Sequence, residues 1–121
     1  MSKHILLLED DLQSREGLKK ILEGHGHRVV TAGTVEEASA ITGADGVDVA
    51  ILDLHLPGLP GDQFATYLRM RCPRARIILI SGEYRVLDPE RFGPETVFLP
   101  KPLQMDELLA AVAGSDASAV A

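Results

Sequence analysis

Short apolar runs alternate along the chain with longer segments in which apolar residues recur every three or four positions. The short runs are residues 5–8, 28–31, 49–52, 77–80 and 96–99. They are too short for typical helices and are rich in strand-forming residues, which favours strands buried on both faces, as in a parallel sheet. Strands that alternate with helices in this way predict an α/β domain with a five-stranded parallel sheet.

The first helix is predicted over residues 12–23. Its apolar residues recur at the spacing i, i+3, i+4 and form one stripe, made of Leu18, Ile21 and Leu22. Gly24 and Gly26 end this helix, and we expect one of them in the left-handed conformation that helix C-termini favour. The second helix begins at a capping box, Thr34 to Glu37, and turns Ala38 and Ile41 inward.

The later helices are less regular. The third carries Phe64, Tyr67 and Leu68 at the spacing of a buried face and ends before Pro73. Residues 83–95 hold two prolines and a glycine, which leave room for about one turn of a shortened or irregular fourth helix. The last helix is predicted over about 105–113, with Leu108, Leu109 and Val112 inward.

The chain of 121 residues is expected to form a single domain, 1–121, with a core over about 4–114 and a frayed tail at 115–121. We expect right-handed crossovers and the strand order 2-1-3-4-5 of doubly wound sheets. Ligands of such sheets bind at the carboxyl ends of the strands. The first, third, fourth and fifth strands end there on polar residues, namely Glu9 and Asp10, Asp53, Ser81, and Lys101.

Composition narrows the classes of function. The formal net charge of −6 argues against a nucleic-acid surface, which needs clustered basic residues. Cys72 is the single cysteine, so no internal disulfide can form and a reducing cytoplasm fits. No apolar stretch approaches a membrane span, and the N-terminus lacks the apolar run of a signal peptide. We therefore expect a cytoplasmic protein that contacts neither membrane nor nucleic acid.

Carboxylates gathered at one sheet edge predict a metal site. Three of them without a cation would repel one another, and at least one would stay protonated. Mg²⁺ prefers oxygen ligands and typically takes one or two carboxylates plus a phosphate oxygen. Asp10 and Asp53 suit that role, with the backbone carbonyl of His55 within reach. Each residue taken alone also fits a helix cap or an ordinary surface position, so the prediction depends on their convergence.

These residues resemble a known family. Glu9-Asp10, Asp53 followed by Leu-His-Leu-Pro57-Gly58, Ser81-Gly82 and Lys101-Pro102 are similar to the motifs of the receiver domain of two-component response regulators. The resemblance covers Ile5 to about Gly114 and implies the flavodoxin-like, CheY-like form of the doubly wound fold.

The resemblance also implies roles. Asp53 would be the phosphoacceptor, taking a phosphoryl group from a sensor histidine kinase or a histidine phosphotransfer protein. Asp10, Asp53 and the His55 carbonyl would hold Mg²⁺, and Glu9 would act through a metal-bound water. Lys101 and Ser81 would bind phosphoryl oxygens, and a cis Lys101–Pro102 peptide would aim the lysine inward.

A switch is implied as well. In the family, the hydroxyl of the fourth strand moves toward the new phosphoryl group, and an aromatic residue three positions before the lysine turns inward. Here those residues are Ser81 and Phe98, and Phe98 is equally compatible with an ordinary core position. His55 and Glu83 occupy positions where the family tunes dephosphorylation, or are simply solvated. Many members of the family dimerise through the fourth helix, the fifth strand and the last helix, and the irregular segment 83–95 argues against such a dimer here.

Two alternative functions fit the sequence less well. An aspartyl-phosphate hydrolase of the dehalogenase-like kind needs a second aspartate two residues after the nucleophile, where this chain has His55. A degenerate receiver that only docks would lack part of the motif set, which is complete here. His25 and His27 lack a third metal ligand and fit exposed loop positions better. Asp11 fits a helix cap rather than a ligand.

Overall fold

The computed structural model describes residues 3–34, 36–38, 40, 46–53, 70, 75–81 and 96–114. Its strands are β1 (His4–Leu8), β2 (Arg28–Ala32), β3 (Val49–Asp53), β4 (Arg76–Ser81) and β5 (Thr96–Pro100), and its helices are α1 (Leu12–Gly24) and α5 (Met105–Ala113). All five predicted strands are confirmed, and each bound lies within one residue of its predicted position.

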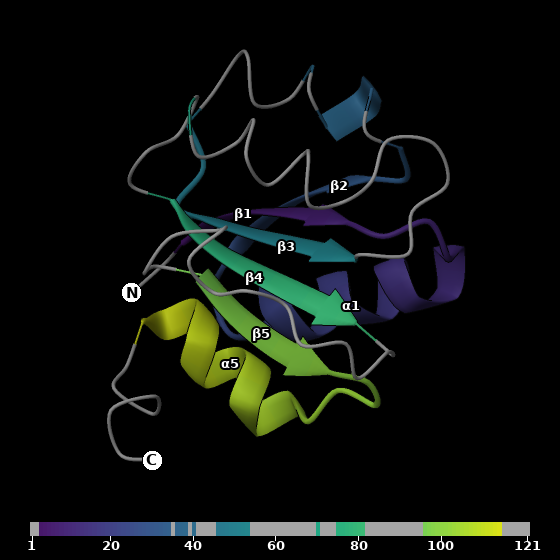
Figure 1. Ribbon diagram of the computed structural model, residues 1–121. Coiled ribbons are helices and arrows are strands. Elements are labelled where there is room, and N and C mark those ends of the chain that lie inside the picture. The colour runs from purple at the N-terminus through teal and green to yellow at the C-terminus, as the bar shows by residue number, and fades with distance from the viewer. Residues whose placement is uncertain are drawn as a thin grey trace.

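The strands form one parallel sheet in the order β2-β1-β3-β4-β5, as predicted. β3 lies at the centre, with Leu52 paired to Leu8 of β1 and Asp53 paired to Ile80 of β4. All five arrows point the same way in Figure 1, so the carboxyl ends of the strands lie along one edge of the sheet. That edge carries Glu9 and Asp10 after β1, Asp53 at the end of β3 and Lys101 after β5.

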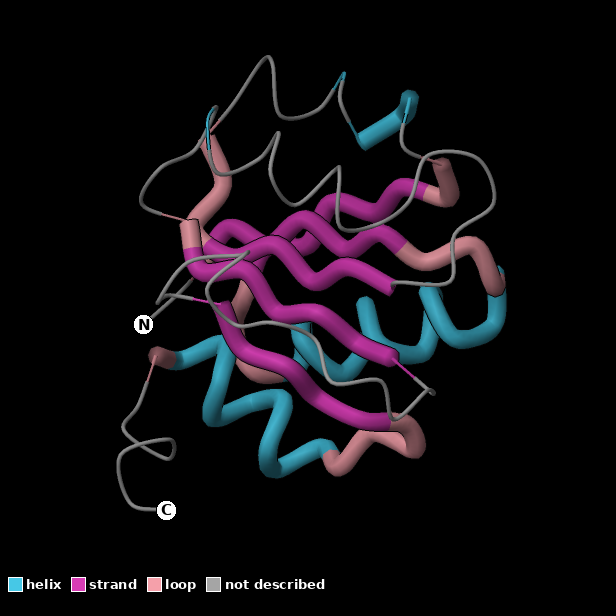
Figure 2. The backbone as a smooth tube through the Cα atoms, viewed as in Figure 1, coloured by secondary structure: helices cyan, strands magenta, loops and turns pink. Residues whose placement is uncertain are grey.

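Alternation along the strands divides the core between the two faces of the sheet. Ile5 and Leu7 of β1 share one face with buried residues of α1 and α5. Leu6 and Leu8 point to the other face, where Ala38 packs. Figure 2 shows α1 and α5 on the same side of the sheet. All five residues of β3 are buried, which explains why its sequence shows no polar alternation until Asp53.

Helix α1 begins at the N-cap Asp11, whose Oδ2 accepts a hydrogen bond from the Ser14 N–H at 2.8 Å. This confirms the capping role predicted for Asp11. The helix ends at Gly24, and Gly26 adopts the predicted left-handed conformation with φ of 89°. Glycine is favoured there because a side chain strains at positive φ.

The predicted apolar stripe of α1 is wrong in one position. Leu18 and Leu22 are buried against the sheet, but Ile21 is 37% exposed. Leu18 and Leu22 lie one turn apart on the line that faces the sheet. Ile21 lies beside that line, where α1 faces the space toward α5.

The second helix begins as predicted. Residues 36–38 and 40 are helical. The Glu37 N–H donates to Thr34 Oγ1 at 3.2 Å, as in a capping box, and Ala38 is fully buried. Helix α5 has the predicted bounds, 105–113, and buries Leu108 and Val112, while Leu109 is partly buried.

Several predictions lie outside the described residues. They concern Ile41, the helix with Phe64, Tyr67 and Leu68, Cys72, the irregular segment 83–95 and the tail 115–121. Within the described part of the chain, no helix is long and apolar enough to cross a membrane.

Candidate functional site

The end of β1 and the end of β3 bring three carboxylates together. Glu9 and Asp10 follow β1 directly, and Asp53 is the last residue of the neighbouring β3. Carboxylate oxygens of all three lie within 4.8 Å of one another. Among the described residues, this is the only group of three or more histidines, cysteines or acidic residues close enough to share a metal ion. The predicted convergence of these three residues is confirmed.

Two of the carboxylates are removed from water. Glu9 is 5% exposed and Asp53 is 2% exposed, whereas Asp10 is exposed. Burial disfavours a charged carboxylate unless a neighbour compensates it. The cluster is therefore a buried anionic pair with a third carboxylate at its rim, open to solvent.

The pKa of Glu9 reflects its burial and its closeness to Asp53. The pKa of Glu9 is raised from 4.5 to about 7, mainly by burial, with smaller increases from the charge of Asp53 and a hydrogen bond with its side chain. The hydrogen bond from the Asp11 N–H and the charge of Lys101 act in the opposite direction. The raised pKa of Glu9 agrees with the prediction that at least one carboxylate stays protonated when no cation is bound. A hard divalent ion with oxygen ligands fits this donor set, because it would compensate the charge that the protein leaves unpaired.

Lys101 supplies the cationic group of the site. Its Nζ lies 3.0 Å from Asp53 Oδ2, and its side chain is 40% exposed. Burial by itself lowers the pKa of Lys101, but the hydrogen bond and charge of Asp53, with the charges of Glu9 and Asp10, outweigh it and raise that pKa. The Lys101–Pro102 peptide is cis, as predicted. The predicted approach of Lys101 to Asp53 is confirmed.

Two groups hold the turn between β1 and α1. The Asp11 N–H donates to Glu9 Oε1 at 3.0 Å. Arg15 Nη1 donates to the Glu9 backbone oxygen at 3.1 Å. Sequence reasoning missed Arg15, because an arginine one turn after a helix cap is equally typical of an exposed helix surface.

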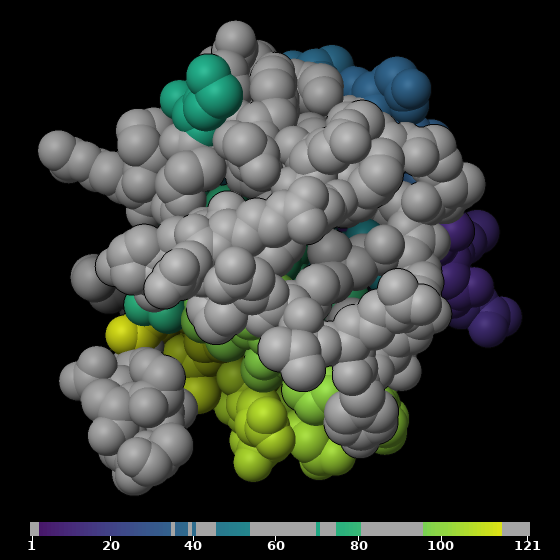
Figure 3. Space-filling view, viewed as in Figure 1, coloured from purple at the N-terminus to yellow at the C-terminus, as the bar shows by residue number. Residues whose placement is uncertain are grey.

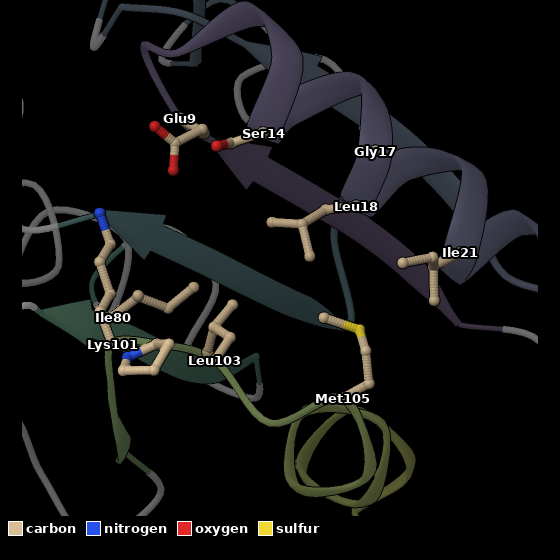
Figure 4. Close-up of a pocket in the computed structure, with 10 residues that line it drawn as sticks. Glu9, Ser14, Gly17, Leu18, Ile21, Ile80, Lys101, Leu103 and Met105 are labelled. Carbon is tan, nitrogen blue, oxygen red and sulfur yellow. The ribbon is translucent and has the colours of Figure 1, made fainter.

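A pocket of about 380 Å³ opens beside the charged residues. Figure 4 shows Leu18, Leu103 and Met105 pointing into it, with Glu9 and Lys101 at one end. Its walls come from α1 and from the segment between β5 and α5. In the space-filling view, that segment and α5 form the lower part of the visible face, and the start of α1 lies at its right-hand edge (Figure 3).

The remaining predicted residues are placed in part or not at all. Ser81 ends β4 and pairs with Pro100, but its side chain lies outside what the structure describes. His55 and Glu83 also lie outside the described residues. Phe98 is partly buried, pairs with Leu79 in the strand register and packs against the core face opposite α1 and α5.

Residues 5–113 match the response regulator receiver domain family. The chain is 30% identical over 116 residues to the response regulator protein FleR of Pseudomonas aeruginosa, covering 93% of this chain and 24% of FleR. It is 29% identical over 111 residues to the cell cycle response regulator CtrA of Brucella ovis, covering 89% of this chain and 47% of CtrA. The chain thus spans half or less of these relatives.

Solved structures are similar over nearly the whole chain. The response regulator TrrA of Thermotoga maritima, in complex with Mg(2+)-BeF, has a TM-score of 0.80 at 31% identity, with 93% of this chain and 97% of TrrA covered. A response regulator of Burkholderia pseudomallei with a phosphorylated aspartic acid, a calcium ion and citrate has a TM-score of 0.81 at 27% identity, with 91% and 66% covered.

The parallel sheet in the order 2-1-3-4-5, with acidic residues and a lysine at its carboxyl edge, defines a signalling domain of the two-component type. With a family match over residues 5–113, the chain belongs to the response regulator receiver domains.

Proposed function

We propose that Asp53 of this receiver domain accepts a phosphoryl group from the phosphohistidine of a sensor histidine kinase or a histidine phosphotransfer protein. The observation that carries the proposal is the environment of Asp53. Its carboxylate is buried at the end of the central strand, 3.0 Å from the Lys101 ammonium and within 4.8 Å of the oxygens of Glu9 and Asp10.

The chain's residues divide the work of phosphoryl transfer. A carboxylate oxygen of Asp53 attacks phosphorus, the new O–P bond forms, and the bond from phosphorus to the donor's imidazole nitrogen breaks with its electron pair left on that nitrogen. Such transfer depends mainly on positioning and on neutralising charge at the phosphoryl oxygens. Lys101 is placed to meet one of those oxygens, and Ser81 is proposed to donate its hydroxyl to another.

The acidic cluster is proposed to hold Mg²⁺, with Asp10 and Asp53 as direct ligands, the His55 carbonyl as a third, and Glu9 acting through a water. When bound, the ion neutralises negative charge on the carboxylates and on the phosphoryl oxygens. The relatives' structures with Mg(2+)-BeF and with calcium support a cation at such a domain. The raised pKa of Glu9, caused mainly by burial and also by the charge of Asp53, supports a cation here, because a cation would favour the ionised carboxylates.

The aspartyl phosphate is proposed to switch the domain. It adds about −1.5 to −2 of charge at the edge of the sheet, beside β4. Ser81 would move toward it, and Phe98, on the neighbouring strand, would turn inward. The partial exposure of Phe98 supports this, because the core does not enclose its side chain completely.

We further propose a single receiver domain over 1–121 that acts in the cytoplasm, where a lone cysteine stays reduced. It would signal through an output partner or domain, contact neither nucleic acid nor membrane itself, and slowly hydrolyse its own aspartyl phosphate. Its net charge of −6 supports a protein partner over a nucleic acid.

The test is incubation of the protein with Mg²⁺ and acetyl phosphate, followed by intact-mass measurement. We expect a mono-phosphorylated species that Asp53→Asn abolishes. Asp48→Asn is the matched control, because Asp48 stands just before the same strand, at its other end. Equal labelling of Asp53→Asn would refute the assignment.

The cation is tested in the same assay. Asp10→Asn should lower the labelling rate at limiting Mg²⁺, and excess Mg²⁺ should recover part of it. Asp11→Asn should leave labelling unchanged, because asparagine is an equally good helix N-cap. A wild-type protein that stays unlabelled with both acetyl phosphate and a phosphorylated histidine donor would indicate a docking module instead.

A further inference from the structure

Arg15, near the start of α1, reaches back to the turn that carries two of the three carboxylates. Its Nη1 donates to the backbone oxygen of Glu9 at 3.1 Å. That oxygen belongs to the peptide unit between Glu9 and Asp10. The hydrogen bond therefore fixes the orientation of the unit from which both carboxylate side chains depart.

Two further backbone groups of this turn also have hydrogen-bond partners. The Glu9 N–H donates to the Ala32 oxygen at 3.1 Å, and the Asp11 N–H donates to Glu9 Oε1 at 3.0 Å. Of these two hydrogen bonds and the one from Arg15, only the one from Arg15 uses a side chain from outside the acidic cluster. The contribution of Arg15 can therefore be removed without altering a cluster residue.

Gly33, directly after β2, makes room for the guanidinium. A Cβ at Gly33 would lie 2.5 Å from Arg15 Nη1 and 3.6 Å from Arg15 Cζ, too close for the present position of Arg15. The backbone does not require glycine there, since Gly26 and Gly114 are the glycines at positive φ in the described part of the chain. An alanine would push aside the end of a flexible side chain and leave the backbone unstrained.

We propose that Arg15 is a positioning residue for the cation site and that Gly33 keeps its guanidinium on the Glu9 carbonyl. The proposal rests on the proposed function, because it concerns the same acidic cluster. Arg15 would touch neither the cation nor the phosphoryl group. It would hold the Glu9–Asp10 peptide so that both carboxylates face Asp53.

The experiment measures Mg²⁺ binding separately from phosphorylation. Mg²⁺ alone is titrated into the full chain and followed by amide chemical shifts, and the labelling rate with acetyl phosphate is then measured against Mg²⁺ concentration. The variants are Arg15→Met, which keeps the aliphatic stem, and Gly33→Ala, which keeps the positive charge. Lys20→Met and Gly24→Ala, on the same helix, are the matched controls.

Both variants should raise the Mg²⁺ dissociation constant about tenfold, the usual lower range for loss of a group that orients ligands. The maximal labelling rate at saturating Mg²⁺ should stay at the wild-type value, and both controls should behave as wild type. Combining Arg15→Met with Gly33→Ala should add nothing to either single change, because both act on one hydrogen bond. Arg15→Lys, which retains a donor, should recover part of the affinity.

Other outcomes overturn the proposal. Variants that lose thermal stability but keep the Mg²⁺ dissociation constant of the controls would leave Arg15 a purely structural role. A loss confined to Arg15→Met, with Gly33→Ala unaffected, would indicate charge rather than position. Wild type that binds Mg²⁺ but stays unlabelled with both acetyl phosphate and a phosphorylated histidine donor would refute the proposed function, while the effect of Arg15 on Mg²⁺ binding would still be measured. Wild type that binds no Mg²⁺ would refute both.

Discussion

The two edges of the sheet use similar residues to opposite effect. At the carboxyl edge, Glu9, Asp10, Asp53 and Lys101 face one another. At the amino edge, polar side chains bond to backbone groups instead. Those bonds run from the His4 N–H to Asp48 Oδ2 at 2.8 Å, from the Lys3 N–H to His27 Nδ1 at 3.1 Å, and between His4 Nδ1 and the Gly46 oxygen at 2.8 Å.

The two edges differ in the partners of their polar side chains. At the amino edge, the partners of these side chains are neutral backbone groups, which hold the side chains in place. At the carboxyl edge two carboxylates are buried beside each other with one lysine, which leaves negative charge that only a proton or a cation can compensate. Residue type alone does not distinguish a reactive edge from a structural one. The partners do.

The largest expected effect tests the lysine. Lys101→Met should slow labelling by acetyl phosphate about 100-fold at saturating Mg²⁺, because it removes the cation placed 3.0 Å from Asp53 where charge develops. Initial rates from intact-mass measurement would show it. Lys3→Met, at the amino edge, should label as wild type. Equal slowing by both changes would mean that net charge, not position, sets the rate.

The next effect concerns pH and the carboxyl edge. Glu9 has a folded pKa of about 7, above its ordinary 4.5, so its stabilising contribution is complete below about 4.5 and is lost as pH rises through 7. Without divalent cations, the free energy of unfolding should fall by up to about 3 kcal/mol over this window. Chemical denaturation of wild type and Glu9→Gln at several pH values measures the difference.

Excess Mg²⁺ should remove most of this dependence, because the cation favours the ionised cluster. A wild-type profile that matches Glu9→Gln at every pH without Mg²⁺ would contradict the shared burial of Glu9 and Asp53.

The smallest effect has the opposite sign and belongs to the amino edge. Burial, with nearby positive charges, lowers the pKa of His27 below its ordinary 6.5. The stabilising contribution of His27 is therefore complete above about pH 6.5 and is lost as the pH falls through the lower pKa of the folded state. The reason is that protonation of Nδ1 breaks its hydrogen bond with the Lys3 N–H.

Wild type should lose stability relative to His27→Gln below pH 6.5 in thermal melts, whether or not Mg²⁺ is present. A difference that depends on Mg²⁺ would show that the two edges are coupled.

The local pattern of apolar and polar residues predicts the fold and most of the residues of the site. An apolar run that ends on a carboxylate, as at Asp53, determines both the strand and its end, and parallel strands bring such ends to one edge. The same pattern predicts that Glu9, Asp10, Asp53 and Lys101 lie together, as they do. It could also assign Asp11 to a cap, since a helix start needs an acceptor for its free N–H groups.

Other features were decided by how elements pack against one another. Periodicity put Ile21 on the buried face of α1, but the space between α1 and α5 leaves it partly exposed. Nothing in the sequence indicated that Arg15 would lie on the Glu9 carbonyl or that Gly33 would make room for it. The raised pKa of Glu9 likewise required its burial depth beside Asp53. Sequence spacing determines which side of an element a residue occupies, whereas distances between elements, and with them contacts and electrostatics, exist only once the chain is packed.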